Sequence, residues 1–115
     1  MNVIAFEKLP GEKLSDKVTR RYVSGEKATL VRLEVKEGAI VPFHHHINEQ
    51  ITYVLQGKIK IIMEGKAWLV ASGEVLVIPP NVPHQFEFLE DSVVIDAFAP
   101  PRVDWLAGDS YYLIK

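Results

Sequence analysis

Segments in which apolar and polar residues alternate run through most of this chain. Residues 28–36 place Val31, Leu33 and Val35 on one face and charged residues on the other, which is the pattern of a half-buried strand. Further strands are expected at residues 51–55, 58–63, 66–70, 75–79, 84–90 and 92–99, with glycine-containing turns at 56–57, 64–65 and 72–73. A strand about every 8–12 residues is typical of an all-β sandwich or barrel. One turn of helix is expected within residues 101–107.

Length and composition limit the partners and the compartment. A chain of 115 residues suits one domain spanning residues 1–115. Its 13 Lys and Arg against 15 Asp and Glu give a net charge of -2, so no nucleic acid is expected as a partner. The absence of cysteine excludes disulfides and thiolate metal sites. The sequence has neither the roughly 18 consecutive apolar residues of a membrane span nor a signal-peptide pattern, so we expect a cytoplasmic protein without membrane partners.

Three of the four histidines are consecutive, at positions 44, 45 and 46. Side chains at positions i and i+2 of a strand project to the same side. His44 and His46 are therefore expected to share a face, and His45 is expected to point away. His84 enters from a distant strand, behind a loop with three prolines at residues 79–83 that restrict the backbone.

A fourth ligand is expected shortly after the histidine run. Strand parity places Gln50 on the face of His46 and Glu49 on the opposite face, but residues 47–48 could loop out, which leaves the choice between Gln50 and Glu49 open. The expected ligand set is His44, His46, Gln50 and His84. Three ring nitrogens and an amide oxygen favour one divalent transition metal, Ni, Zn, Fe, Mn, Co or Cu, over Ca or Mg. The alternative is a surface histidine run without a ligand role.

Two stretches of the chain resemble the two motifs of the cupin superfamily. The positions in register are Gly38, His44, His46 and Gly57 in the first motif, and Gly73, Pro79 and His84 in the second. Three positions depart from the pattern, with Gln50 in place of the liganding Glu, Asn81 in place of Gly and Phe88 in place of the final Asn. The resemblance implies a compact cupin-type β-barrel or jelly roll that holds a metal inside.

The change from Glu to Gln at position 50 has a chemical consequence. A neutral amide leaves a divalent ion with its full charge, which makes it a stronger Lewis acid. It also removes an anionic ligand that helps to stabilise higher oxidation states. The substitution therefore favours non-redox chemistry over dioxygen activation.

A narrower resemblance covers nearly the whole chain. The ligand pattern at residues 44–50 and the run DAFAPPR at 96–102 are similar to the small cupins of pectin and alginate catabolism, which convert 4,5-unsaturated uronates to linear keto forms. The resemblance implies that Asp96 handles a proton, Phe98 shapes the pocket and Arg102 binds the substrate carboxylate. Phe86, two residues after His84, is expected to line the same interior.

Structural roles are the alternatives for the two charged residues of this set. Asp96 could cap a turn or pair with Arg20 or Arg32, and Arg102 could pair with Asp104 at the surface. These alternatives require no ligand.

Three functions follow from these motifs. The favoured one is a metal-dependent isomerase that acts on a small anionic substrate, an unsaturated uronate. The others are a metal-dependent dioxygenase acting on a small organic substrate and a non-catalytic sugar- or anion-binding cupin. A homodimer is expected, because an open barrel leaves strand edges to cover; the apolar residues 3–6 and 111–114 are candidates for this role.

Overall fold

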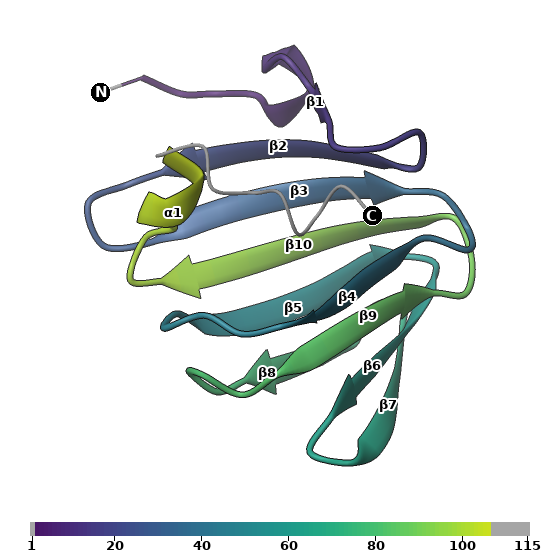
Figure 1. Ribbon diagram of the computed structural model, residues 1–115. Helices are drawn as coiled ribbons and strands as arrows, with labels where there is room; N and C mark the ends of the chain where they lie inside the picture. The colour runs from purple at the N-terminus through teal and green to yellow at the C-terminus, as the bar shows by residue number, and fades with distance from the viewer. Residues whose placement is uncertain (1, 107–115) are drawn as a thin grey trace.

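The computed structural model of the protein describes residues 2–106 and contains two antiparallel sheets (Figure 1). The strands are β1 (Glu12–Lys13), β2 (Val18–Ser24), β3 (Thr29–Val35), β4 (Ile40–His44), β5 (Glu49–Gln56), β6 (Lys58–Met63), β7 (Lys66–Ala71), β8 (Val75–Ile78), β9 (His84–Phe88) and β10 (Ser92–Ala99). The larger sheet has the order β1-β2-β3-β10-β5-β8 and the smaller sheet has the order β4-β9-β6-β7. This architecture confirms the all-β jelly roll.

Two short helical segments complete the described part of the chain, the 3-10 turn η1 (Phe6–Lys8) and α1 (Val103–Leu106). The segment α1 confirms the helical turn expected after Pro101. In residues 2–106, no helix has the length and apolar character that crossing a bilayer requires. Residues 111–114, a candidate dimer segment, lie outside the described residues, and Val3 in the other candidate segment is fully exposed.

The seven predicted strand segments form β3 and β5 to β10, whereas β1, β2 and β4 were not predicted. In β2, the charged side chain of Arg20 occupies an inward position and is only 2% exposed, so polarity does not alternate there with the pleat. In β4, Pro42 interrupts the strand pattern, and the apolar Phe43 occupies an exposed, outward position. Both strands therefore lack the period-two signal.

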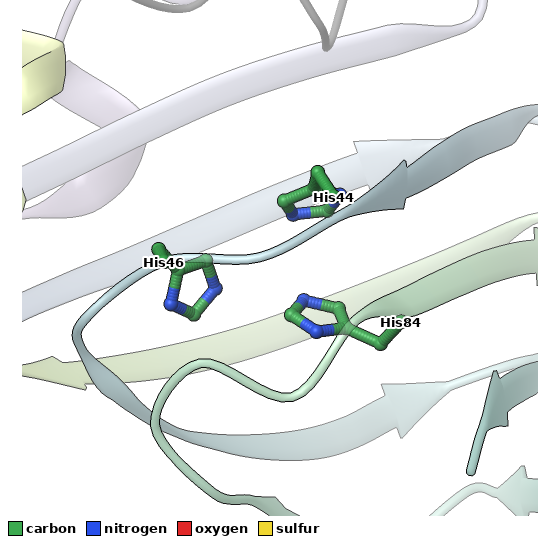
Figure 2. A group of neighbouring side chains, drawn as sticks. All are labelled: His44, His46 and His84. Carbon is green, nitrogen blue, oxygen red and sulfur yellow. The ribbon is translucent and has the colours of Figure 1, made fainter.

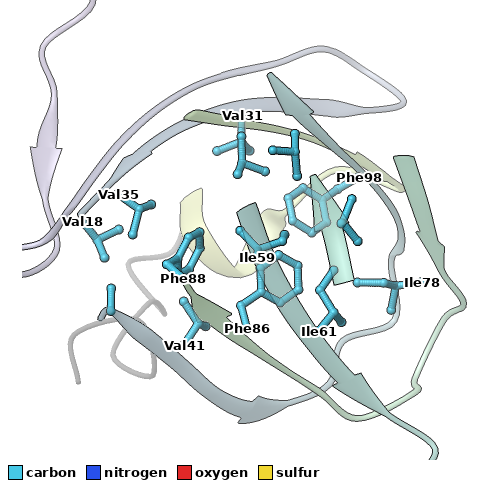
Figure 3. Packing of buried hydrophobic residues seen from close by; sticks show 14 of the residues in the cluster. Val18, Val31, Val35, Val41, Ile59, Ile61, Ile78, Phe86, Phe88 and Phe98 are labelled. Atoms are coloured by element: carbon cyan, nitrogen blue, oxygen red, sulfur yellow. The ribbon is translucent and has the colours of Figure 1, made fainter. Parts of the chain in front are cut away.

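Side chains from the inner faces of both sheets fill the space between them (Figure 3). Val31, Ile59 and Ile61 are completely buried, and Phe86 and Phe88 pack side by side with their ring centroids 6.1 Å apart. Such burial of apolar side chains is the main favourable contribution to folding. Several polar side chains are buried as well: Arg20, Thr29, Asn48, Gln50, Thr52, His84, Ser92, Asp96 and Arg102.

The loop between β8 and β9 is tied to the histidine run. Asn81, where the cupin motif has glycine, adopts a left-handed conformation with φ 63°, which asparagine tolerates better than most residues. Its backbone N–H donates a hydrogen bond to the carbonyl of His46 at 2.8 Å. The turn thus survives the substitution, and it places His84, at the start of β9, beside the segment that carries His46.

Candidate metal centre

Three histidines from two distant segments converge between the sheets. His44 ends β4 and His84 begins β9, and the two residues are direct partners in the antiparallel register. His46 lies in the turn after β4, and one ring nitrogen from each of the three lies within 4.8 Å of the others (Figure 2). His45 is exposed. The expected parity of the run is therefore present, although β4 ends at its first histidine.

Each histidine of this cluster has one ring nitrogen at a backbone carbonyl. The Nδ1 atoms lie 2.9 Å from the carbonyl oxygen of Pro42 for His44, 3.0 Å from that of Asn48 for His46 and 2.8 Å from that of Val82 for His84. A carbonyl only accepts, so each Nδ1 carries the proton in the neutral ring and each Nε2 presents a lone pair. This is the arrangement in which protein histidines bind metals.

Gln50 supplies an oxygen to the same cluster. Its side chain is only 3% exposed, whereas Glu49 is exposed. The Oε1 atom of Gln50 lies 3.0 Å from Nε2 of His46. Both ring nitrogens of His46 thus face oxygen atoms, but a neutral imidazole has only one proton to donate. The lone pairs of Nε2 of His46 and Oε1 of Gln50 therefore face each other without a proton between them. A cation that accepts both lone pairs resolves this conflict, so these residues fit a metal.

Two further properties of the histidines suit metal binding. Burial lowers the pKa of His44 and of His46 to about 4, and it also lowers the pKa of His84. The three rings are therefore neutral at pH 7, as metal ligands must be. Among the described residues, Nε2 of His84 is buried and has no hydrogen-bond partner, which a ligand role would explain.

Asp96 lies next to Gln50 in the interior. One of its carboxylate oxygens, Oδ1, accepts hydrogen bonds from the Thr52 hydroxyl at 2.7 Å and from Nε2 of Gln50 at 3.2 Å. Burial raises the pKa of Asp96 to about 6, against the opposing effects of these two hydrogen bonds and of the Arg102 charge. A carboxyl group with this pKa can both take and give a proton near neutral pH. Its hydrogen bonds are with Thr52 and Gln50, whereas Arg20 pairs with Glu12 and Arg32 with Glu34.

Arg102 is buried and held on several sides. Its guanidinium makes two hydrogen bonds to the Asp104 carboxylate, at 2.9 and 2.7 Å, and lies over the rings of Phe98 and Trp105. Burial alone would raise the pKa of Asp104. The hydrogen bonds and the positive charge of Arg102, together with hydrogen bonds from nearby backbone N–H groups, outweigh burial and lower this pKa. The pair with Asp104 is thus present, but Arg102 is only 1% exposed and not a surface residue.

A cavity of about 40 Å³ brings most of the expected site residues together. Its wall includes His44, Gln50, His84, Phe86, Asp96, Phe98 and Arg102. His46 is not part of this wall but contacts Phe98, with ring centroids 5.4 Å apart. Candidate metal ligands, a carboxylate and a guanidinium thus share one small space.

Comparison with known proteins identifies the family. The model of the cupin domain matches residues 31–98. This chain is a cupin. It is 32% identical over 103 residues to the pectin degradation protein KdgF of Dickeya dadantii (strain 3937), a match that covers 87% of this chain and 94% of that protein.

Solved structures show the same fold. KdgF from Halomonas sp. has 27% identity and a TM-score of 0.84, with 90% of this cupin and 99% of that chain covered. An RmlC-like cupin from Shewanella frigidimarina NCIMB 400 also has a TM-score of 0.84, with 23% identity and coverage of 91% and 96%. At that identity the second likeness concerns the fold alone.

Sequence reasoning missed three residues that shape the site of this cupin. Thr52 is completely buried and bonded to Asp96. Asn48 accepts from His46 through its carbonyl and donates through Nδ2 to the carbonyls of Pro100 and Pro101. Trp105 contributes to the cavity wall. Only Thr52 had a usable signal, since it lies two residues after Gln50 and therefore on the same face.

Proposed function

We propose that this cupin is a metal-dependent isomerase that converts 4,5-unsaturated uronates to their linear keto forms. The observation that carries the proposal is the placement of the Asp96 carboxylate beside Gln50, in the cavity that His44 and His84 also line. The 32% identity with a pectin degradation protein supports this class of substrate. Unsaturated uronates are produced when pectin is cleaved by elimination.

In this proposal, His44, His46, Gln50 and His84 hold one divalent transition metal. Three nitrogens and one neutral oxygen suit such an ion. When bound, the metal supplies Lewis acidity toward substrate oxygens, with no negative charge from these four ligands to weaken it.

The residues of the chain account for the proton movement. In the cyclic substrate, the hydroxyl on C1 loses a proton as the bond between C1 and the ring oxygen breaks, which gives an aldehyde. The ring oxygen becomes the C5 ketone as C4 gains a proton. One proton leaves and one is added, so the product is an isomer. Asp96, with a pKa of about 6, takes the proton from one position and returns it to the other.

We propose that part of the cavity wall shifts when the substrate enters. A cavity of about 40 Å³ has room for only a few water molecules, whereas a uronate has six carbons. Arg102 and Trp105, which follow the last strand, are wall residues outside the sheets. We propose that they move together and that Arg102 then exchanges part of its pairing with Asp104 for the substrate carboxylate, which accepts the same two-pronged hydrogen bonding.

The test is an assay of the metal-loaded protein with an unsaturated uronate. Loss of the absorbance of the conjugated double bond, with a product of unchanged mass, is the expected result. Loaded protein that does not accelerate this loss over buffer would overturn the isomerase. Uptake of oxygen by the same sample would instead indicate a dioxygenase, and recovery of bound, unchanged uronate would indicate a binding protein.

We also propose that the cupin forms a homodimer through the outer face of β10, β5 and β8. Residues in register there form one apolar row, from Leu30 on β3 through Ala97 and Ile51 to Val77. A second row contains Ile95, Tyr53 and Val75. Leu30, Ile51, Tyr53, Val75 and Val77 are 38–55% exposed.

A second copy of the chain is the partner that this face suits. Monomers rarely expose contiguous apolar patches larger than a few hundred Å², and sheets pack face to face when both faces are apolar. The residues named in the two rows are uncharged, and the charged Arg32 continues the second row only on β3, so over β10, β5 and β8 two copies related by a twofold axis would meet without like-charge repulsion. Sedimentation velocity at micromolar concentration should give the mass of two chains. The mass of one chain would overturn the dimer.

A further inference from the structure

Three polar side chains form a closed hydrogen-bonded group behind the histidine cluster. Thr52 on β5 and Asp96 on β10 are direct partners in the antiparallel register. The Thr52 hydroxyl donates to Oδ1 of Asp96 at 2.7 Å and accepts from Nε2 of Gln50 at 3.0 Å, while the same Nε2 donates to Oδ1 of Asp96 at 3.2 Å. All three residues are at most 3% exposed.

This group decides which end of the Gln50 amide faces the histidines. The amide nitrogen donates within the group, to Oγ1 of Thr52 and Oδ1 of Asp96, which lie 2.7 Å apart. The amide oxygen is therefore directed to Nε2 of His46, 3.0 Å away. A reversed amide would bring its oxygen against the Asp96 carboxylate and against a hydroxyl whose only proton already goes to that carboxylate. A buried oxygen without a donor costs about 1–3 kcal/mol.

We propose that Thr52 is a positioning residue, which holds the Gln50 amide with its oxygen toward His44, His46 and His84 so that this oxygen serves as a metal ligand. The hydroxyl of Thr52 acts in two ways. It accepts a hydrogen bond from the Gln50 amide, and it donates one to the Asp96 carboxylate, which accepts from the same amide. The inference rests on the metal site of the proposed function, but no assay of uronate turnover is needed to test it.

The test compares Thr52→Val with Thr52→Ser by titrating Co²⁺ into the metal-free proteins and recording visible absorption. Valine has the shape of threonine without the hydroxyl, and serine retains the hydroxyl. Mutation of a residue that orients a metal ligand typically weakens metal affinity about 10–100-fold. The Kd for Co²⁺ should therefore rise roughly tenfold or more in Thr52→Val, and the absorption bands of the bound Co²⁺ should change. The Kd of Thr52→Ser should stay within about threefold of wild type.

Ser92→Ala is the matched control. Ser92 lies on the same strand as Asp96 and is also buried, but its hydroxyl donates to the carbonyl of Glu90. This variant loses one buried hydrogen bond away from the cluster, and it should bind Co²⁺ like wild type. Equal Co²⁺ binding by Thr52→Val and wild type would overturn the proposal, as would an equal loss in the Thr52→Ser and Thr52→Val variants.

A second measurement needs no variant. In the metal-free wild-type protein, the side-chain amide protons of Gln50 should exchange with solvent far more slowly than those of the exposed Gln56, as observed by NMR. Equal exchange rates would overturn the proposal even if Thr52→Val did not fold. If wild-type protein failed to bind Co²⁺, the metal site itself would be wrong, and this outcome is distinct from a failure of the Thr52 variants.

Discussion

The two faces of β5 and β10 differ in a way that inverts the usual relation between polarity and burial. On the inner face, Gln50, Thr52 and Asp96 are polar and at most 3% exposed. On the outer face of the same strands, Ile51 and Tyr53 are apolar and 40% and 38% exposed. An antiparallel sheet with one solvated face normally has the opposite arrangement.

The outer face of the smaller sheet is mixed, because exposed Ile40 and Leu69 lie at the two ends of a row whose middle is charged. Lys60 on β6 and Glu87 on β9 are partners in register and form an ion pair at 3.3 Å. Their inward neighbours Ile59, Ile61, Phe86 and Phe88 are apolar and buried. The polar groups on the buried side of β5 and β10 carry the proposed metal and substrate site, and the two uncharged apolar rows on the open side carry the proposed interface.

The largest effect is expected from a change of one atom on the inner face. Asp96→Asn keeps the shape of the side chain but removes the group that exchanges a proton, so kcat for an unsaturated uronate should fall about 10²–10⁴-fold. Co²⁺ binding should persist, because Asp96 is not one of the proposed ligands and the asparagine Oδ1 can still accept from Thr52 and Gln50. Asp91→Asn, exposed just before β10, is the control. If the Asp96→Asn variant kept the kcat of the wild type, Asp96 would not be the proton carrier.

Gln50→Glu should separate metal binding from folding on the same face. It replaces an amide N–H, now 3.2 Å from Oδ1 of Asp96, with a second carboxylate. Repulsion between the two should lower the Tm of the metal-free protein, while the added negative charge should tighten Co²⁺ binding roughly tenfold or more. Thermal unfolding with and without Co²⁺ measures both effects. An unchanged Tm for the metal-free variant together with weaker binding would contradict the arrangement described.

A charge on the outer face should act on assembly alone. In Tyr53→Lys, each copy would bring a lysine into the apolar face, so sedimentation should show single chains with unchanged Co²⁺ affinity. Ile62→Lys, on the outer face of the smaller sheet, is the control and should remain a dimer. If Tyr53→Lys sedimented as a dimer, the interface would lie elsewhere.

The sequence predicted those features that depend on spacing along one strand. Parity placed His44 and His46 together, but it left the choice between Gln50 and Glu49 open, because a turn separates β4 from β5. It did not predict that Asp96 bonds with Thr52, because these residues are 44 positions apart and only the order β10-β5 brings them into register. A local sequence pattern shows which face of a strand a residue occupies, but it does not show which strand pairs with that strand.

Arg102 shows a different limit. The sequence permitted both a pocket role and a pair with Asp104, and the structure has Arg102 in the cavity wall and bonded to Asp104 at the same time. Two residues of spacing are enough to form the pair. The burial of the pair depends on Trp105 and Phe98, whose rings lie against the guanidinium, and no motif in the chain specifies that packing.

The smallest effect is expected from removing methyl groups on either face. Val54 is completely buried and Val77 is 49% exposed. Val54→Ala should lower the free energy of unfolding by about 1–3 kcal/mol, because it leaves a cavity in the core. Val77→Ala should cost less than about 0.5 kcal/mol in the Tyr53→Lys background, where Val77 faces water, and more than that in the dimer. Urea unfolding in both backgrounds measures the difference. An equal cost of Val77→Ala in both would mean that this face stays open to solvent.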